Sequence, residues 1–174
     1  MKLKNSIRLL ITCDSGAAAG KTTAAKYLSK RYKLNLLTSG LLYRYVAHKL
    51  INSKKKTSDI FFLRKIIKKI TPKVLKNKKL YTSEVTKFTS EIAKIKKIRL
   101  LLKSYQKQFA NKKLAVLEGR DMGFLFPNAD VKIFFKCSLE IAARRRFKEF
   151  QKTNKEVTLE EVKKAIKLRN LNDT

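Results

Sequence analysis

The chain has 174 residues, of which 44% are hydrophobic, and its 43 Lys and Arg against 13 Asp and Glu give a formal net charge of +30. This length accommodates one hydrophobic core with small inserted subdomains. No apolar run approaches the ~20 residues of a membrane span, and the short apolar stretch near the N-terminus lacks the features of a secretory signal. We therefore expect a cytoplasmic protein with no membrane association.

The positive charge by itself suggests nucleic-acid binding. However, the 33 Lys outnumber the 10 Arg and are spread over every segment of the chain. Dedicated phosphate recognition usually recruits Arg, whose planar fork makes bidentate contacts. We therefore interpret the charge as a compositional bias that raises the association rate of anionic nucleotides, and expect no specific nucleic-acid partner.

The first predicted elements are a buried strand over 7–13, a loop of small residues and a helix that ends near residue 32. The loop leads into Gly20-Lys21-Thr22, and this order is typical of a phosphate-binding loop. Small side chains let successive backbone N–H groups point at one anion, and the helix N-terminus adds partial positive charge. Lys21 can reach a β- or γ-phosphate, and the Thr22 hydroxyl can reach Mg²⁺. The usual first Gly of the loop is Ser15 here, so either Gly16 takes the left-handed conformation or the turn differs.

A second short strand is predicted over 34–37, and Ser39 is a candidate cap for a helix over 41–52. A polar connection follows, and Ser58 or Asp59 is expected to cap a helix over 60–70. Thr71-Pro72 ends that helix.

The stretch 74–81 predicts two very short strands around a polar turn. Helices are expected over 84–93 and 95–109, the first of them capped by Thr82 or Ser83.

Two more buried strands are predicted over 114–117 and 131–135, with an irregular loop over 119–123 between them. Helices over 139–150 and 157–168 follow. Thr158 and Glu161 have the spacing of a capping box at the start of the second.

Four short, continuous apolar strands that alternate with helices are typical of an α/β fold with a parallel sheet covered on both faces. In such sheets the ligand lies outside the carboxyl ends of the strands. The loops expected to converge there span residues 14–22, 38–44, 118–123 and 136–138. The mostly helical stretch 53–105 lies between two core strands, and we interpret it as an inserted subdomain.

Arginines recur near this predicted edge: Arg44 and Arg120 follow strands, Arg145 and Arg146 lie on a helix that leaves it, and Arg169 lies near the end of the chain. Several Arg around one phosphate loop suit phosphoryl transfer between two phosphorylated molecules. Such a transfer needs no strong general base when the acceptor is itself a phosphate.

Four segments of the chain are similar to bacterial cytidylate kinases, which are nucleoside monophosphate kinases: residues 14–23, 38–44, 118–130 and 142–147. The most specific part is Gly-Arg-Asp-Met-Gly over 119–123, followed by Phe-Pro-x-Ala-Asp-x-Lys-Ile-Phe over 126–134. The resemblance covers most of the chain. Its departures include Ser15, Thr38 in place of a usual Asp, and Thr22 where Gly is frequent.

The resemblance implies a P-loop NTPase three-layer sandwich that transfers phosphate from ATP to CMP or dCMP with Mg²⁺, as a monomer. It implies a kinase core over 1–52 and 106–143, a monophosphate-binding insertion over 53–105 and a helical lid over 144–174. The family continues with another lid Arg, a strand and a helix, so we expect the lid to be truncated.

The resemblance also implies roles for individual residues. Lys21, Arg120 and Arg169 are expected to be catalytic, and Thr22 to contact the metal. The expected ATP-binding residues are Ser15, Gly16, Ala17, Ala18, Ala19, Gly20, Lys21, Thr22, Thr23, Arg145 and Arg146. The expected monophosphate-binding residues are Ser39, Arg44, Ser90, Arg99, Arg120, Asp121, Arg169 and Asp173. Among the latter, Arg44 and Arg120 would hold the phosphate, and Ser90, Arg99 and Asp121 would read the cytosine edge.

Two alternatives stay open at this point. One is a kinase for another small acceptor, either a different monophosphate or dephospho-coenzyme A, which substrate competition for ATP turnover would distinguish. The other is a basic nucleic-acid-binding P-loop module, which selective binding retained near physiological salt would favour.

Overall fold

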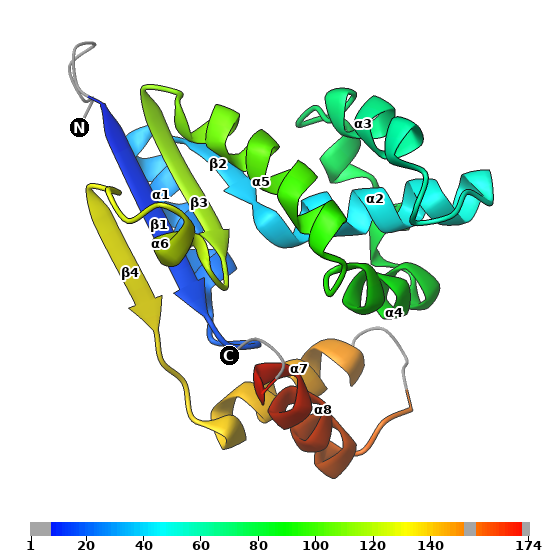
Figure 1. Cartoon of the computed structure of the whole chain (residues 1–174). Coiled ribbons are helices and arrows are strands. Elements are labelled where there is room, and N and C mark those ends of the chain that lie inside the picture. Colours follow the sequence, from blue (N-terminus) through cyan, green and yellow to red (C-terminus); the bar gives the residue numbers. More distant parts are fainter. Residues whose placement is uncertain (1–7, 152–155, 172–174) are drawn as a thin grey trace. The chain divides into compact units, whose positions relative to one another are not determined.

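The structure, a computed structural model, describes residues 8–151 and 156–171 (Figure 1). It contains two compact units: residues 1–36 with 113–174 form the first, and residues 37–112 the second. The boundary falls within β2 (Asn35–Thr38). None of the helices in the described ranges is long and apolar enough to cross a membrane.

The sheet has the strand order β2-β3-β1-β4 (Figure 1). Its central strand, β1 (Leu9–Ser15), runs parallel to both β3 (Leu114–Gly119) and β4 (Val131–Phe135). The sequence placed these strands within two residues of their observed bounds. The predicted α/β fold with a parallel sheet is therefore confirmed.

The two faces of β1 are covered by different helices, because successive side chains of a strand point to opposite faces. Ile11 and Cys13 pack on one face with Ala25 of α1 (Lys21–Tyr32). On the other face Asp14 binds the start of α6 (Met122–Leu125). Burial on both faces explains why β1 begins with three apolar residues, Leu9 to Ile11.

The prediction that β4 is a buried strand is wrong. Val131 is 41% exposed and Phe134 63% exposed, whereas Ile133 and Phe135 pack against the core that contains β1 and α1. β4 comes last in the strand order, so it has one neighbouring strand among the described residues. An edge position leaves half of its side chains outside the core, which apolar composition alone does not reveal.

The last two helices of the first unit, α7 (Leu139–Gln151) and α8 (Leu159–Leu171), pack against each other. Their shared core consists of Ala142, Ala143, Val162 and Ile166. The predicted capping box is confirmed. The Glu161 N–H donates to the Thr158 hydroxyl at 3.2 Å, and the Thr158 N–H donates to the Glu161 carboxylate at 2.7 Å.

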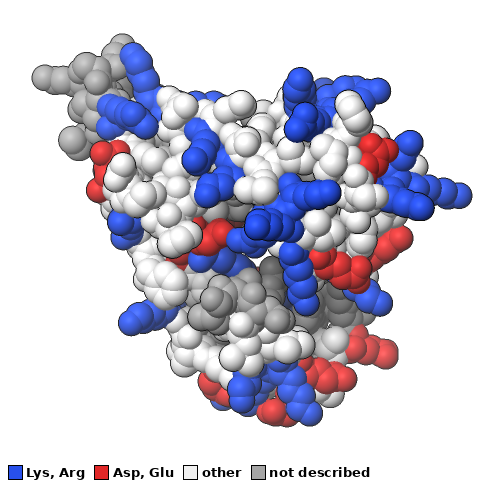
Figure 2. All heavy atoms as spheres, in the orientation of Figure 1, with Lys and Arg blue, Asp and Glu red and all other residues white. Residues whose placement is uncertain are grey.

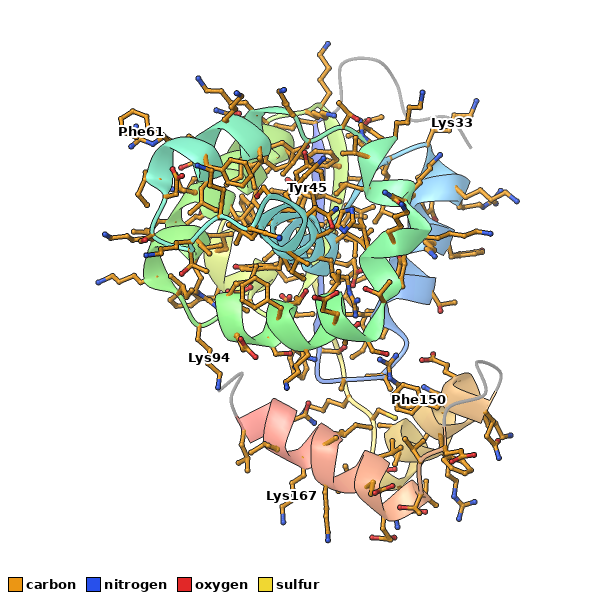
Figure 3. The ribbon with its side chains drawn as sticks, turned by 90° about the vertical axis from the view of Figure 1, so that its right-hand side faces the viewer. Lys33, Tyr45, Phe61, Lys94, Phe150 and Lys167 are labelled. Carbon is orange, nitrogen blue, oxygen red and sulfur yellow. The ribbon has the colours of Figure 1, made fainter. Side chains whose placement is uncertain are left out.

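The second unit is helical, with α2 (Ser39–Ser53), α3 (Ile60–Lys68), α4 (Ser83–Ile92) and α5 (Lys96–Ala110). Tyr45 of α2 lies among these helices and is buried, whereas Phe61 of α3 points outward and is 88% exposed (Figure 3). The repeating apolar positions of the four helices build the core of this unit, as their helical spacing predicts.

The two short strands predicted over 74–81 are wrong. This stretch forms two 3₁₀ turns, η1 (Val74–Lys76) and η2 (Lys78–Tyr81). The Asn77 side chain accepts the N–H of Lys79 at 2.9 Å, which starts the second turn, and Leu80 is fully buried. A local side-chain hydrogen bond and one anchoring apolar residue thus replace the strand pairing that we expected.

In the second unit, two of the predicted helix caps are present and one is not. Asp59 accepts the N–H of Phe62 at 2.9 Å, and Thr82 accepts that of Val85 at 3.3 Å. Ser39 is not the cap of α2, because the helix begins at Ser39 itself after Thr38. The buried Ser39 hydroxyl instead accepts a hydrogen bond from the Gln106 amide at 2.8 Å.

Loss of the Asp59 cap has a measurable cost. Asp59→Ala is expected to lower the free energy of unfolding by about 1 kcal/mol, because an N–H of the first turn of α3 loses its acceptor. Asp59→Asn is the matched control: it keeps the capping oxygen and removes only the charge that pairs with Lys55 at 3.6 Å. Urea unfolding measures both. Equal destabilisation by the two variants would show that the ion pair matters and the cap does not.

Candidate functional site

The phosphate loop runs from the end of β1 to the start of α1. Its left-handed residues are Ala18, with φ 55°, and Gly20, with φ 94°. Ser15 remains in β1, where its hydroxyl donates to the Gly16 carbonyl at 2.7 Å. The turn therefore differs from the consensus, and Ser15 replaces the usual Gly without adopting a positive φ.

One of the two predicted lid arginines lies over this loop. The Arg145 guanidinium is 3.8 Å from the point where a Cβ on Gly20 would lie. Arg146 instead pairs with Glu149 at 2.7 Å, and its guanidinium lies 4.8 Å from the centroid of the Phe150 ring. Arg145 thus adds positive charge beside the N-terminus of α1, while Arg146 interacts within its own helix.

A buried carboxylate faces the first two residues of α1. Glu118, only 2% exposed, comes near the end of β3 opposite Cys13 of β1. Both of its oxygens lie 3.1 Å from the Thr22 hydroxyl, and one lies 3.9 Å from the Lys21 ammonium. These two partners compensate for burying the charge. Glu118 was not among the predicted site residues, although an acidic residue near the end of a buried apolar strand was a usable signal.

The pair of Thr22 and Glu118 suits a hard cation. Hydroxyl and carboxylate oxygens are ligands that Mg²⁺ accepts, together with substrate phosphates and water. Within residues 8–151 and 156–171, no cluster of three or more His, Cys, Asp or Glu is arranged to hold a metal. A Mg²⁺ ion at Thr22 and Glu118 would therefore need phosphate or water oxygens to complete its coordination.

Arg120 and Asp121 come directly after β3 and line a cavity of about 280 Å³ in the first unit. The cavity brings together residues from the carboxyl end of β1, from the middle of β4 and from the start of α6. Its walls are formed by Asp14, Arg120, Asp121, Gly123, Phe124, Lys132, Ile133 and Phe134. The expectation that polar residues gather at the carboxyl edge of the sheet is met for this part of the chain.

Four predicted monophosphate-binding residues belong to the second unit. Ser39 and Arg44 lie on α2, Ser90 on α4 and Arg99 on α5, the last two exposed. Arg44 donates 2.8 Å hydrogen bonds to the Leu80 carbonyl and the Thr86 hydroxyl, and its guanidinium lies 5.3 Å from the Tyr81 ring centroid. These contacts orient the Arg44 side chain before any substrate binds.

The end of α8 also reaches the phosphate loop. The Ala17 N–H donates to the Asn170 side-chain oxygen at 3.1 Å, and Ala17 and Ala18 pack against the shared core of α7 and α8. The sequence analysis missed Asn170. Of the two predicted residues nearby, the Arg169 side chain and all of Asp173 lie outside the described residues.

The basic residues are distributed rather than gathered. Figure 2 shows Lys and Arg over much of the visible surface of the chain, with Asp and Glu between them.

Comparison with known proteins agrees with this geometry. The family model described as cytidylate kinase matches residues 11–174. A cytidylate kinase from Fusobacterium nucleatum is 31% identical, over 95% of this chain and 81% of its own length. Those from Acidiphilium cryptum and Clostridioides difficile are 37% and 35% identical, over 81% and 88% of this chain and 67% and 76% of their own lengths.

A solved structure of an uncharacterized protein from Eubacterium ventriosum supports the fold alone. Its TM-score is 0.55 at 14% identity, over 95% of this chain and 73% of that one. The family model covers the phosphate loop, Glu118 and the Arg120-Asp121 loop together, and the three relatives match most of the chain. The chain therefore belongs to the cytidylate kinase family.

Proposed function

We propose that the chain transfers the γ-phosphoryl group of ATP to CMP or dCMP, giving ADP and CDP or dCDP. Family membership supports the reaction. The structural observation that carries the proposal is the phosphate loop, whose Lys21 and Thr22 converge on the buried carboxylate of Glu118. This arrangement places a mobile cation, a hydroxyl and an acid where the phosphates of a nucleotide would lie.

ATP would bind along residues 15–23, the predicted ATP-binding loop. Backbone N–H groups of the loop and of the first turn of α1 would bind phosphate oxygens. Lys21 would move from Glu118 to the phosphates, and Arg145 beside Gly20 would add a second cation. Arg146 remains a predicted ATP-binding residue, and it would have to leave Glu149 to take that part.

Mg²⁺ would be held by Thr22 and Glu118 together with phosphate oxygens. Held there by Thr22 and Glu118, the ion would supply positive charge to offset the charge of the nucleotide phosphates. The 3.1 Å contact between the hydroxyl and the carboxylate supports this assignment, because it already gathers two oxygen ligands at one point.

We propose that Arg44 and Arg120 hold the phosphate group of the monophosphate, and that Ser90, Arg99 and Asp121 read cytosine. Ser39, Arg169 and Asp173 complete the proposed contacts. The insertion over 53–105 and the lid over 144–174 would close over both nucleotides and exclude water during transfer. We further propose a cytoplasmic monomer with no specific nucleic-acid partner.

An ADP-release assay with ATP and Mg²⁺ tests the proposed function. CMP, dCMP, UMP, AMP, GMP and dephospho-coenzyme A are offered in turn to the wild-type chain, with each acceptor also omitted as a blank. Selective turnover of CMP and dCMP is expected. Selective turnover of another acceptor, or ATP binding with no turnover of CMP, would contradict the assignment.

Removal of the Thr22 hydroxyl tests the metal assignment. Thr22→Ala is expected to raise the Mg²⁺ concentration needed for half-maximal activity several-fold, because one oxygen ligand is lost. Ser29→Ala is the matched control, since it removes a hydroxyl of α1 that donates to the Leu34 carbonyl instead. A Mg²⁺ titration of both variants decides the matter. Unchanged Mg²⁺ dependence in Thr22→Ala would rule out the direct contact.

A further inference from the structure

Asp14 is a buried carboxylate to which no role has been given above. It is only 7% exposed and lies next to last in β1, directly before the phosphate loop. One of its oxygens accepts the N–H of Met122 at 2.8 Å, and the other accepts the N–H of Gly123 at 2.6 Å. Both donors lie in the first turn of α6. The carboxylate thus joins the end of β1 to the segment that follows Arg120 and Asp121.

These two hydrogen bonds, together with the positive charge of Lys21, compensate for burying the charge. Burial raises the pKa of Asp14, and the N–H groups of Gly123 and Met122 act in the opposite direction. Hydrogen bonds to an ionised acceptor are stronger than neutral ones. Removing the acceptor would leave the buried N–H of Met122 and the half-buried N–H of Gly123 without their partner, which costs more than the bonds contribute. The Asp14 link is therefore a strong local constraint.

Gly123 makes the close approach possible. A Cβ at this position would lie 3.2 Å from the nearer Asp14 oxygen, and 3.6 Å from the Thr12 hydroxyl. Such a carbon would crowd the same Asp14 oxygen that accepts the 2.6 Å hydrogen bond from the Gly123 N–H. The link therefore depends on a second residue, and a variant of Gly123 can disturb it without touching the Asp14 charge.

Arg120 and Asp121 occupy the short segment between two fixed points. On one side, Gly119 ends β3 and lies opposite Asp14 in the pairing of β1 with β3. On the other side, Met122 and Gly123 are bonded to the Asp14 carboxylate. Asp14, Arg120 and Asp121 all line the same cavity. Asp14 thus contacts the chain on both sides of the segment formed by Arg120 and Asp121.

We propose that Asp14 is a positioning residue, which fixes Arg120 and Asp121 relative to the phosphate loop. The inference rests on the proposed function for the identity of the two substrates. Asp14 leads into the loop proposed for ATP and ties down the segment proposed for the monophosphate. In-line transfer needs both substrates at a fixed separation, and a misplacement of about 1 Å can cost about 100-fold in rate.

Steady-state kinetics on Asp14→Asn and Gly123→Ala test the proposal. The Asn side chain keeps one acceptor oxygen but turns an NH₂ group toward the second N–H, so it breaks one bond of the link. Both variants are expected to lower kcat/KM for CMP about tenfold or more, with a much smaller change in KM for ATP. We expect kcat/KM for CMP to change more than KM for ATP because β1 and the phosphate loop keep their own contacts, whereas residues 120–125 lose one of theirs.

Asp130→Asn is the matched control. Asp130 also accepts a backbone N–H of β1, that of Leu10 at 2.7 Å, but at the opposite end of the strand. It is expected to affect thermal stability without the selective loss toward CMP. Three results would overturn the positioning role. One is an equal loss of kcat/KM for CMP in Asp130→Asn. The others are equal changes toward ATP and CMP in Asp14→Asn and Gly123→Ala, or unchanged kinetics in these two variants.

Amide hydrogen exchange measured by NMR separates this proposal from the proposed function. The Met122 and Gly123 amides are expected to exchange slowly in the wild type and faster in both variants, whether or not CMP is the substrate. If the wild type fails to phosphorylate CMP while the amides behave as expected, the substrate assignment fails and the link stands. If exchange is the same in all three proteins, the link itself is wrong.

Discussion

Replacing Lys21 with Met is expected to lower kcat for phosphoryl transfer by about 100-fold or more, because the substitution removes a preorganised charge proposed to act on the transition state. Lys21 begins α1 directly after Gly20. Its ammonium lies 3.9 Å from Glu118, so the side chain already points to the site in the absence of nucleotide. Met keeps the length and packing of the side chain but has no charge, and the expected loss is therefore electrostatic.

Lys26→Met provides the matched control for this substitution. Lys26 is an exposed residue of the same helix, one and a half turns further on, and its replacement makes the same change in net charge. Single-turnover measurements with saturating ATP and CMP separate transfer from binding. A similar loss in both variants would mean that overall charge, rather than the position of Lys21, governs the rate.

Arg120→Ala is expected to lower kcat/KM for CMP about tenfold or more, because a charged hydrogen bond to the acceptor phosphate is lost. Arg120 follows β3 and lines the cavity that also contains Asp14 and Asp121. The same substitution is expected to change KM for ATP much less. Arg31→Ala, an exposed Arg in the last turn of α1, tests whether the loss of any Arg has this effect.

Arg44→Ala is expected to lower kcat/KM for CMP about as much as Arg120→Ala does, and also to lower the stability of the protein. Arg44 bonds to Leu80 and Thr86, so its removal also loosens the contact between α2, η2 and α4. Thermal unfolding of each variant separates the two effects, since Arg120→Ala carries no loss of the α2 contacts. Wild-type kinetics in both folded variants would contradict the proposed role of these arginines on the phosphate.

The Asp14 link and the Lys21–Glu118 contact have a common physical origin. The first joins the end of β1 to the residues that follow β3, and the second joins the start of α1 to the end of β3. The parallel pairing of β1 with β3 sets these segments side by side. A parallel sheet thus brings together groups about 100 residues apart in the chain, at the carboxyl edge where ligands bind. The proposed substitutions at Asp14 and Lys21 test residues at the end of β1 and the start of α1, and those at Arg120 and Gly123 test residues that follow β3.

Local patterns in the sequence were sufficient to identify the strand, loop and helix that begin the chain, the parallel α/β fold and most of the helix caps. Each of these depends on residues close together in the chain. Small residues before Gly20-Lys21-Thr22 permit the loop, and Asp59, Thr82 and Thr158 bond to an N–H three residues away. The spacing of apolar residues likewise determines which segments form helices or buried strands.

Tertiary structure decided which polar groups meet and which strand faces are covered. Glu118 and Asp14 gained their partners only when β3 paired with β1, and Asn170 reached Ala17 only through the packing of α8. The exposed face of β4 and the 3₁₀ turns around the buried Leu80 also depend on neighbours distant in sequence. Apolar composition shows that a segment favours burial, but the cost of burying a polar group depends on partners that folding alone brings within hydrogen-bonding distance.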